Sequence, residues 1–124
     1  MESLLKGKKL LIIDDDASMI KLFETMLEGT GAEISTTDSS KTGLEICKVL
    51  NPDLVLTDIL MAEPDGYEVT RTIKSDSPNT PVVLLSKQFS AETEQKAQEL
   101  KALTLQLPTT RKVVIPFLEN IFRR

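Results

Sequence analysis

The run Asp53-Leu-Val-Leu-Thr-Asp58-Ile-Leu-Met61 decides the fold of this chain. The part between Asp53 and Asp58 is largely apolar, and it ends abruptly in the carboxylate of Asp58. Such a run is typical of a strand that is buried on both faces of a parallel sheet. The last residue of that strand lies at its carboxyl end, where open α/β sheets place their ligand sites. We therefore expect Asp58 to lie at a functional edge of the sheet.

A second run ends in the same way, because Lys9-Leu-Leu-Ile-Ile is followed by the three acids Asp14, Asp15 and Asp16. Two buried parallel strands that both end in aspartate deliver these side chains to one edge of the sheet. This pairing of two strand ends is the strongest functional signal in the sequence.

The rest of the chain alternates between apolar runs and stretches with apolar residues at helical spacing. These patterns predict strands over 8–14, 32–37, 54–57, 81–86 and 103–107, and helices over 17–28, 40–50, 67–75, 90–101 and 109–124. Five alternating strand–helix units indicate an α/β fold. We expect a doubly wound, flavodoxin-like domain over residues 1–124, with a five-stranded parallel sheet of order 2-1-3-4-5 and helices on both faces.

Pro116 leaves two alternatives for the last helix, whose apolar residues include Val113, Val114, Phe117, Leu118 and Ile121. Either a helix that starts near residue 109 is kinked at the proline, or the helix begins near Pro116 with the proline in its first turn.

Composition excludes several classes of function. The chain has 124 residues with 15 basic and 19 acidic side chains, a net charge of -4, which argues against direct nucleic-acid binding. It has no histidine, which removes histidine triads and imidazole metal ligands. Cys47 is the only cysteine, and we expect a structural thiol. No apolar stretch is long enough to span a bilayer, so we expect a cytoplasmic protein.

Converging carboxylates from Asp14, Asp15 and Asp58 would repel one another unless a cation or a proton lay between them. Mg²⁺ prefers oxygen ligands and usually takes one or two carboxylates together with water and phosphate oxygens. A carboxylate beside such an ion can attack a phosphoryl group and become an aspartyl phosphate. Ser86 ends the fourth predicted strand, where its hydroxyl is placed to bond the new phosphate.

At these positions the chain resembles a receiver domain of the two-component response-regulator family, over essentially its whole length. The resemblance is carried by Leu-Ile-Ile-Asp14-Asp15-Asp16, Asp58-Ile-Leu-Met61, Asp65-Gly66 and Pro81-Val-Val-Leu-Leu-Ser86. Taken together these motifs are specific, although each alone is weak.

The resemblance implies a role for each matching residue. Asp58 would be the phosphoacceptor, and Ser86 would be the switch hydroxyl that moves toward the phosphate. Asp15 would bind Mg²⁺ directly, Asp14 would bind it through water, and the backbone carbonyl of Leu60 would complete the protein ligands, which include Asp58.

The resemblance also implies the partners. A separate histidine kinase or histidine phosphotransfer protein would donate the phosphoryl group, because this chain has no histidine of its own. The helix over 90–101, the strand over 103–107 and the last helix would face a partner or an output domain. We expect a signalling phosphoacceptor of a two-component phosphorelay rather than an enzyme, catalysing at most its own phosphorylation and dephosphorylation.

The sequence departs from the family pattern on one side of the site. The family lysine before a proline is Leu107 here, and its loss removes a charge-assisted hydrogen bond worth roughly 1.5–3 kcal/mol. Thr104 stands where the family has an aromatic switch residue, and Ala62 replaces an expected proline. Lys87 follows Ser86 in place of a small residue. It would either substitute for the missing lysine in the acidic pocket or point to solvent.

These departures leave three functional hypotheses. In the first, the chain is a working receiver that is phosphorylated on Asp58. In the second, it is a pseudo-receiver that binds partners without phosphorylation. The third rests on Asp14-Asp15-Asp16-Ala-Ser18, which formally matches the start of haloacid-dehalogenase-like phosphatases, with Asp14 as nucleophile and Asp16 as general acid. Alternatively, Asp16 caps the helix that follows it.

Overall fold

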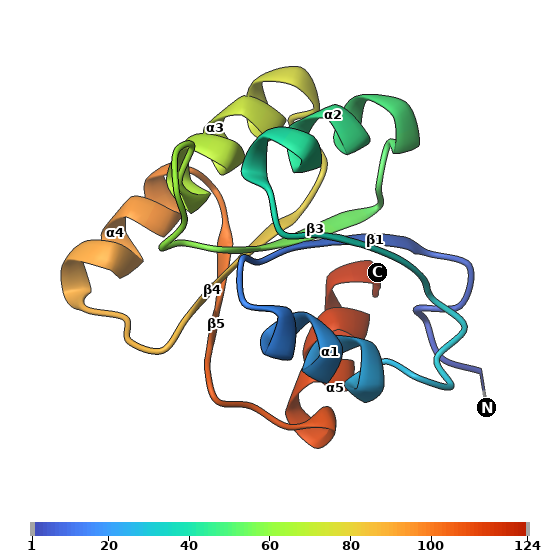
Figure 1. The fold of residues 1–124 in the computed structure, drawn as a ribbon. Helices are drawn as coiled ribbons and strands as arrows, with labels where there is room; N and C mark the ends of the chain where they lie inside the picture. The colour runs from blue at the N-terminus through green and yellow to red at the C-terminus, as the bar shows by residue number, and fades with distance from the viewer. Residues whose placement is uncertain (1, 124) are drawn as a thin grey trace.

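The computed structural model describes residues 2–123, which fold into one parallel sheet between two layers of helices (Figure 1). The sheet has five strands in the predicted order β2-β1-β3-β4-β5. The strands are β1 (Lys9–Ile13), β2 (Glu33–Thr37), β3 (Leu54–Asp58), β4 (Val82–Ser86) and β5 (Leu103–Gln106). The helices are α1 (Ala17–Met26), α2 (Ser40–Leu50), α3 (Gly66–Asp76), α4 (Ala91–Glu99) and α5 (Arg111–Phe122).

The three central strands are buried on both faces, as their apolar runs predict. In β1, Leu10 and Ile12 pack in a cluster with side chains of α1 and α5, whereas Leu11 and Ile13 pack in a cluster with side chains of α2 and α3. This alternation follows from the two-residue period of a strand. It places α1 and α5 over one face of the sheet and α2, α3 and α4 over the other (Figure 1).

Polar side chains at the helix starts fix where each of the first four helices begins. Asp16 accepts hydrogen bonds from the backbone N–H groups of Ser18 and Met19, so it caps α1 as one of the sequence alternatives proposed. Ser39 and Asp65 cap α2 and α3 in the same way, and Ser90 forms a capping box at α4. All four caps lie at the carboxyl edge of the sheet, because each helix follows a strand in a parallel α/β fold.

The last helix does not begin near Pro116, so that alternative is wrong. It starts at Arg111, so Pro116 lies inside the helix, not in its first turn. Val114 and Leu118 are fully buried against the sheet, and this packing outweighs the backbone hydrogen bond that proline cannot donate. Arg111 also donates hydrogen bonds from Nη1 to the carbonyl oxygens of Met26 and Glu28, both at 2.7 Å. Its guanidinium therefore caps the end of α1.

The N-terminal segment before β1 is joined to α5. Ser3 donates a hydrogen bond from its hydroxyl to the Glu119 carboxylate at 2.7 Å. Leu5 is fully buried in the same cluster as α5, and the Lys8 ammonium lies 5.0 Å from the centre of the Phe122 ring. The two ends of the described chain are thus tied together. No helix within residues 2–123 combines the length and the apolar composition needed to cross a membrane.

Candidate functional site

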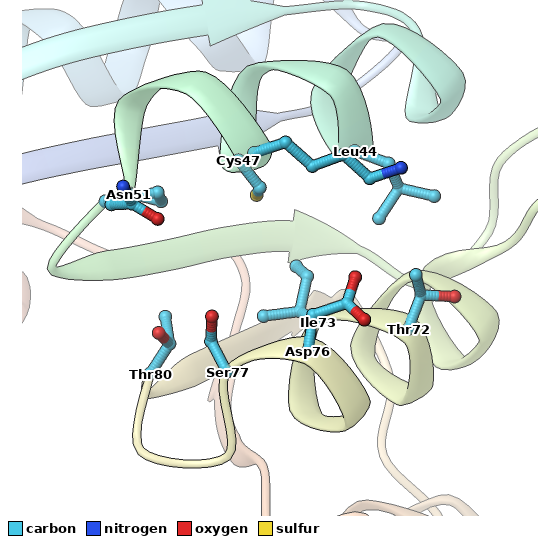
Figure 2. A pocket seen from close by; sticks show the side chains of 10 residues that line it. Leu44, Cys47, Asn51, Thr72, Ile73, Asp76, Ser77 and Thr80 are labelled. Atoms are coloured by element: carbon cyan, nitrogen blue, oxygen red, sulfur yellow. The ribbon is translucent and has the colours of Figure 1, made fainter.

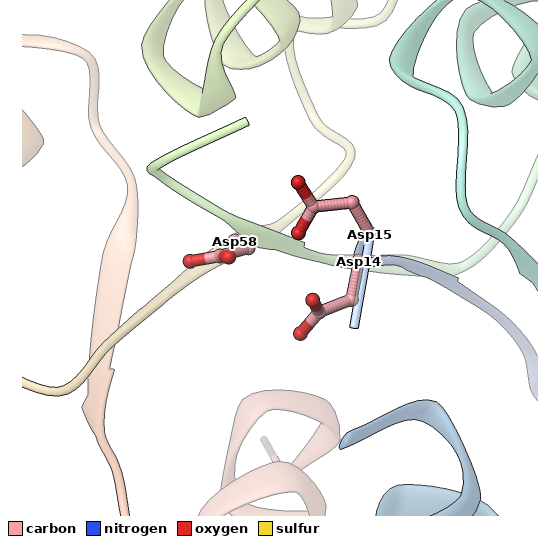
Figure 3. Close-up of side chains that lie close together, drawn as sticks. All are labelled: Asp14, Asp15 and Asp58. Atoms are coloured by element: carbon pink, nitrogen blue, oxygen red, sulfur yellow. The ribbon is translucent and has the colours of Figure 1, made fainter. Parts of the chain in front are cut away.

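The neighbouring strands β1 and β3 bring three aspartates together at the carboxyl edge of the sheet. Ile13 pairs with Thr57 across the two parallel strands, so the residues that follow, Asp14 and Asp58, lie side by side. One carboxylate oxygen from each of Asp14, Asp15 and Asp58 lies within 4.8 Å of the others. Figure 3 shows the three side chains near one another where β1 and β3 end. The predicted convergence of Asp14, Asp15 and Asp58 is therefore present.

The loop after Asp58 is held close to the start of α3 by Gly66. The backbone N–H of Gly66 donates to the carbonyl of Ile59 at 2.9 Å. A Cβ atom on Gly66 would meet the backbone of Asp58 and would lie 2.7 Å from the Cα of Ile59. Because backbone atoms cannot move aside as a flexible side chain would, only glycine allows this close approach. Gly66 therefore helps to fix the loop that presents Asp58.

Asp14 is the most buried of the three acids, with 2% of its surface exposed. Burial raises the pKa of its carboxyl group to about 6, although the backbone N–H of Asp16 donates a hydrogen bond to it at 2.9 Å. The negative charges of Asp58, Asp15 and Asp16 raise the pKa further. Without a cation, Asp14 therefore keeps its proton up to a pH of about 6, well above the range of an ordinary aspartate.

Burial also raises the pKa of Asp58, and the charges of Asp15 and Asp16 add to the effect. The backbone N–H groups of Ile59 and Leu60 lower it in part by stabilising the carboxylate. Two carboxyl groups with raised pKa values at one strand edge indicate an environment that favours either a proton or a cation.

The residues present fit a hard divalent cation. Three carboxylate oxygens close enough to share one ion are the donors that Mg²⁺ prefers. Burial and the mutual repulsion of the acids raise the pKa of Asp14 and Asp58, and a bound cation would offset both effects. The arrangement supplies few protein ligands, so room remains for water and for the oxygens of a phosphate. The donor set resembles the Mg²⁺ sites of phosphoryl-transfer proteins in this respect.

The acids open into a hollow of about 560 Å³ that includes the remaining predicted site residues. It is lined by Asp14, Asp15, Asp16, Met19, Asp58, Ile59, Leu60, Ser86, Lys87, Gln88, Thr93 and Leu107. The side chain of Leu60 is 79% exposed, which suits a residue whose expected contribution comes from its backbone carbonyl. Met19 and Gln88 were not expected here. Neither residue belongs to the sequence motifs that indicated the site.

The hydroxyl of Ser86 is engaged within its own turn. It donates to the carbonyl of Gln88 at 2.9 Å and accepts from the N–H of Gln88 at 3.2 Å. Ser86 therefore lines the hollow but bonds the β4–α4 loop. To bond a phosphate on Asp58, this hydroxyl would have to exchange its present partner.

Lys87 is the basic residue that lines the hollow, but its side chain is exposed. Within residues 2–123 the ion pair that forms is between Lys6 and Glu2, so Lys87 makes none with the acids. In this state Lys87 lies at the rim of the acidic hollow rather than bonded to a carboxylate.

Leu107 is built into the core at the point where the family pattern has a lysine. It is 5% exposed and packs in the cluster that includes Leu105, Val114 and Leu118. Its backbone N–H donates to the carbonyl of Ser86 at 2.8 Å. The Leu107 side chain thus forms an apolar part of the wall of the hollow. Thr104 lies partly exposed on β5.

A second hollow of about 360 Å³ lies between α2 and α3 (Figure 2). Its wall includes Cys47, whose thiol points between the two helices. Burial raises the pKa of this thiol to about 11, so it remains protonated and a poor nucleophile at neutral pH. This agrees with the structural role predicted for Cys47.

Comparison with known proteins gives a consistent result. The family model described as response regulator receiver domain matches residues 10–105. The cell cycle transcriptional regulator CtrA of Caulobacter vibrioides is 32% identical over 88 residues, which cover 71% of this chain and 38% of that protein. The cell cycle response regulator CtrA of Brucella ovis is 32% identical over 78 residues, covering 63% and 34%. This chain therefore spans well under half the length of these relatives.

Solved structures agree in fold. The chemotaxis protein CheY4 of Vibrio cholerae superposes with a TM-score of 0.85 at 22% identity, covering 92% of this chain and 98% of that one. A CheY-like receiver domain protein from Methanospirillum hungatei gives 0.87 at 20% identity, with 93% of each chain covered. At these identities the likeness concerns the fold alone.

Proposed function

Because this chain belongs to the response regulator receiver domain family, we propose that it accepts a phosphoryl group on Asp58 and thereby controls a partner or an output domain. The observation that carries the proposal is the cluster of Asp14, Asp15 and Asp58, whose carboxylate oxygens lie within 4.8 Å of one another. It supplies both an acceptor carboxylate and the ligands for a cation. The chain is thus a signalling acceptor rather than a turnover enzyme.

In the proposed reaction, a carboxylate oxygen of Asp58 attacks the phosphorus of a phosphohistidine on a histidine kinase or phosphotransfer protein. The new oxygen–phosphorus bond forms as the phosphorus–nitrogen bond breaks, and the imidazole keeps the electron pair and takes up a proton. The backbone N–H groups of Ile59 and Leu60 favour the ionised form of Asp58, which is the form that attacks.

Asp15, Asp14 and Asp58, with the backbone carbonyl of Leu60, would hold Mg²⁺ beside the acceptor. When bound, the ion would neutralise charge on the transferring phosphoryl group. Asp14 would bind through water, which is consistent with its 2% exposure and with the hydrogen bond that it already accepts from Asp16.

Ser86 and Lys87 would serve the phosphorylated state. We propose that the Ser86 hydroxyl leaves Gln88 and donates to a phosphate oxygen. Lys87 would reach the same phosphate from the rim, because its side chain is long, exposed and on the wall of the hollow. In this role it would replace the cation that Leu107 cannot supply.

The test is phosphorylation with a small acyl phosphate donor and Mg²⁺, followed by intact-mass spectrometry. We expect one added phosphoryl group that is removed by hydroxylamine, as an acyl phosphate should be. Asp58→Asn should abolish it, and the matched variant Asp38→Asn, which changes an exposed acid outside the cluster, should not. Equal labelling of the Asp58→Asn variant and the parent would refute Asp58 as acceptor.

A second candidate function is a pseudo-receiver that binds its partner without phosphorylation. It is favoured by the buried, apolar Leu107 and by the Ser86 hydroxyl bonded within its own turn. Partner binding, or a cellular readout, that is unchanged in Asp58→Ala would support this candidate. Loss of the readout in that variant would support the phosphorylated receiver.

A further inference from the structure

Another hollow, lined by several lysines, lies at the opposite edge of the sheet from the aspartates. It has a volume of about 440 Å³ and is lined by Lys8, Asp53, Lys74, Asn79, Pro81, Val82, Lys101, Leu103, Ile121 and Phe122. Lys8, Asp53 and Pro81 directly precede β1, β3 and β4, so the hollow lies where the strands begin. Its size is within the range of small-molecule sites, roughly 300–1,000 Å³.

Three lysines converge on this hollow in a protein whose net charge is -4. None of them forms an ion pair in the part of the chain that the structure describes, where the pair present joins Lys6 to Glu2. The Asp53 carboxylate, which also lines the hollow, already accepts a hydrogen bond from the backbone N–H of Lys9 at 2.8 Å. The cluster therefore has an uncompensated positive charge.

The positions of Lys74 and Lys101 show that their proximity is unfavourable in the empty protein. Lys74 is half-buried in the last turn of α3, and both its burial and the charge of Lys101 lower its pKa. Like charges that face one another cost free energy unless an anion lies between them.

Lys101 occupies a backbone conformation that favours glycine. It follows the C-cap of α4 with φ of +58°, and Lys101 and Ala102 donate backbone hydrogen bonds to the carbonyls of Gln98 and Ala97. This is the left-handed position that usually ends a helix with glycine. A lysine there adopts a disfavoured conformation and places one more cation at the hollow.

An apolar wall completes the site. Val82 is fully buried, while Leu103 is 43% exposed and presents an apolar surface beside the lysines. The Lys8 ammonium lies 5.0 Å from the centre of the Phe122 ring, a cation–π arrangement that holds this charge on the same wall. The hollow thus combines several ammonium donors with a surface suited to a flat apolar group.

We propose that this hollow binds a small organic phosphate, a phosphomonoester on a flat apolar body such as a mononucleotide. The ammonium groups of Lys8, Lys74 and Lys101 would donate to the phosphate oxygens, and Asn79 would supply a further polar contact. The wall formed by Leu103, Ile121 and Phe122 would cover the apolar body. Three cations against the one carboxylate of Asp53 match the charge of a phosphate dianion.

A simpler role for two of these lysines lies in the helices themselves. Lys74 is in the last turn of α3 and Lys101 follows α4, where cations interact favourably with the negative end of a helix dipole. This role explains neither Lys8 nor the mutual repulsion of Lys74 and Lys101. It also predicts that substitution changes stability alone, which distinguishes it from ligand binding.

The proposal can be tested by NMR titration of the full chain with adenosine monophosphate at constant ionic strength. Inorganic phosphate and adenosine are titrated separately, so that the charged and apolar parts of the probe are measured on their own. We expect saturable shifts in the resonances of Lys8, Asn79, Leu103 and their neighbours, and tighter binding of the monophosphate than of either part.

Two variants sharpen the test. Lys101→Gly removes a cation from a position that suits glycine, so its melting temperature should be unchanged or higher. Its affinity, and that of Lys74→Gln, should fall by about tenfold, the effect of losing one charge-assisted hydrogen bond. Lys41→Gln, a matched loss of an exposed lysine on α2, should leave affinity unchanged.

Any of three results would overturn the proposal. The first is resonance shifts no larger than those caused by sodium chloride, and the second is an unchanged affinity in Lys101→Gly. The third is resonance shifts confined to the region of Asp14, Asp15 and Asp58. Equal affinity for inorganic phosphate and adenosine monophosphate would show that the apolar body contributes nothing to binding. Tighter binding of a short polyglutamate peptide would assign the surface to a protein partner instead. None of these results bears on phosphorylation of Asp58, which is measured separately.

Discussion

The carboxyl group of Asp14 links the acidic site to the stability of the protein. Its pKa is about 6 in the folded protein, against 3.8 for an unperturbed side chain. Between these two pH values the folded state binds more protons than the unfolded state, so the free energy of unfolding falls as pH rises. Above about pH 6 the ionised Asp14 destabilises the metal-free protein by the full amount.

The first prediction is therefore that Asp14→Asn stabilises the metal-free protein at pH 7, by about 2–3 kcal/mol. The amide oxygen of asparagine can still accept the N–H of Asp16, so the turn is preserved. The gain should shrink toward pH 4, where Asp14 is protonated in the folded protein and partly protonated in the unfolded chain. Urea unfolding at the two pH values measures the difference.

Asp38→Asn provides the control, because Asp38 is an exposed acid outside the cluster. If Asp14→Asn did not stabilise the protein at pH 7, or stabilised it equally at pH 7 and pH 4, the raised pKa of Asp14 would not be the cause. Mg²⁺ should narrow the gap between the variant and the parent, because the ion supplies the positive charge that the parent lacks.

At the scale of single elements, α5 combines a favourable packing face with an unfavourable residue. Pro116 is exposed and lies at the sixth position of the helix, where it cannot donate to the carbonyl of Lys112. The helix is held instead by buried residues such as Val114 and Leu118.

The second prediction is that Pro116→Ala raises the free energy of unfolding by about 1–2 kcal/mol. The restored helical hydrogen bond is worth up to about 3 kcal/mol, and the greater freedom of the unfolded chain offsets part of it. Thermal unfolding followed by circular dichroism measures the change. Asn120→Ala, at another exposed position of α5, should have a much smaller effect, and a loss of stability in Pro116→Ala would contradict the prediction.

Elements whose identity depends on local pattern were predictable from the sequence. The apolar runs that end in Asp14 and Asp58 predicted both the buried strands and the meeting of their carboxylates, because strand ends in a parallel sheet share one edge. The start of α5 was ambiguous, because a local rule for proline competes there with the burial of Val114 and Leu118, which only the assembled sheet provides.

Features that depend on distant contacts, or on the exact conformation of one turn, were not predictable. The hydrogen bonds of Arg111 to the end of α1 join residues more than eighty positions apart. The engagement of the Ser86 hydroxyl by Gln88 depends on the conformation of one turn. For Leu107, the sequence identified the missing lysine, but its packing into the core required the arrangement of β5 and α5.

At the scale of the whole molecule, Leu107 lies directly after β5, between the acidic hollow and the core. Its backbone N–H donates to the carbonyl of Ser86, and its side chain packs in the core. Leu107 therefore contacts both the end of β4 and the cluster that includes α5. A lysine at this position would bring an ammonium group to the acids and to a phosphate on Asp58.

The third prediction is that Leu107→Lys strengthens the coupling between the site and β5. With Mg²⁺ and beryllofluoride, a mimic of the acyl phosphate, NMR shifts in Leu103–Gln106 should be larger in the variant than in the parent. The variant should also be less stable without ligands, by about 2–4 kcal/mol, because a buried apolar side chain is lost. Leu107→Met conserves volume and polarity and should behave like the parent. Equal β5 shifts in parent, Lys and Met variants would exclude Leu107 from the coupling.

The hydrogen bond between Ser3 and Glu119 has a consequence for how the chain can be rearranged. It brings the segment before β1 against α5, beside the ends of the strands that are remote from Asp58. Within residues 2–123, a short linker should therefore be able to join the two ends, and new ends can be opened in a surface loop with the sheet order intact. The acidic edge would keep its geometry in such a circular permutant, since no residue of that edge belongs to the junction.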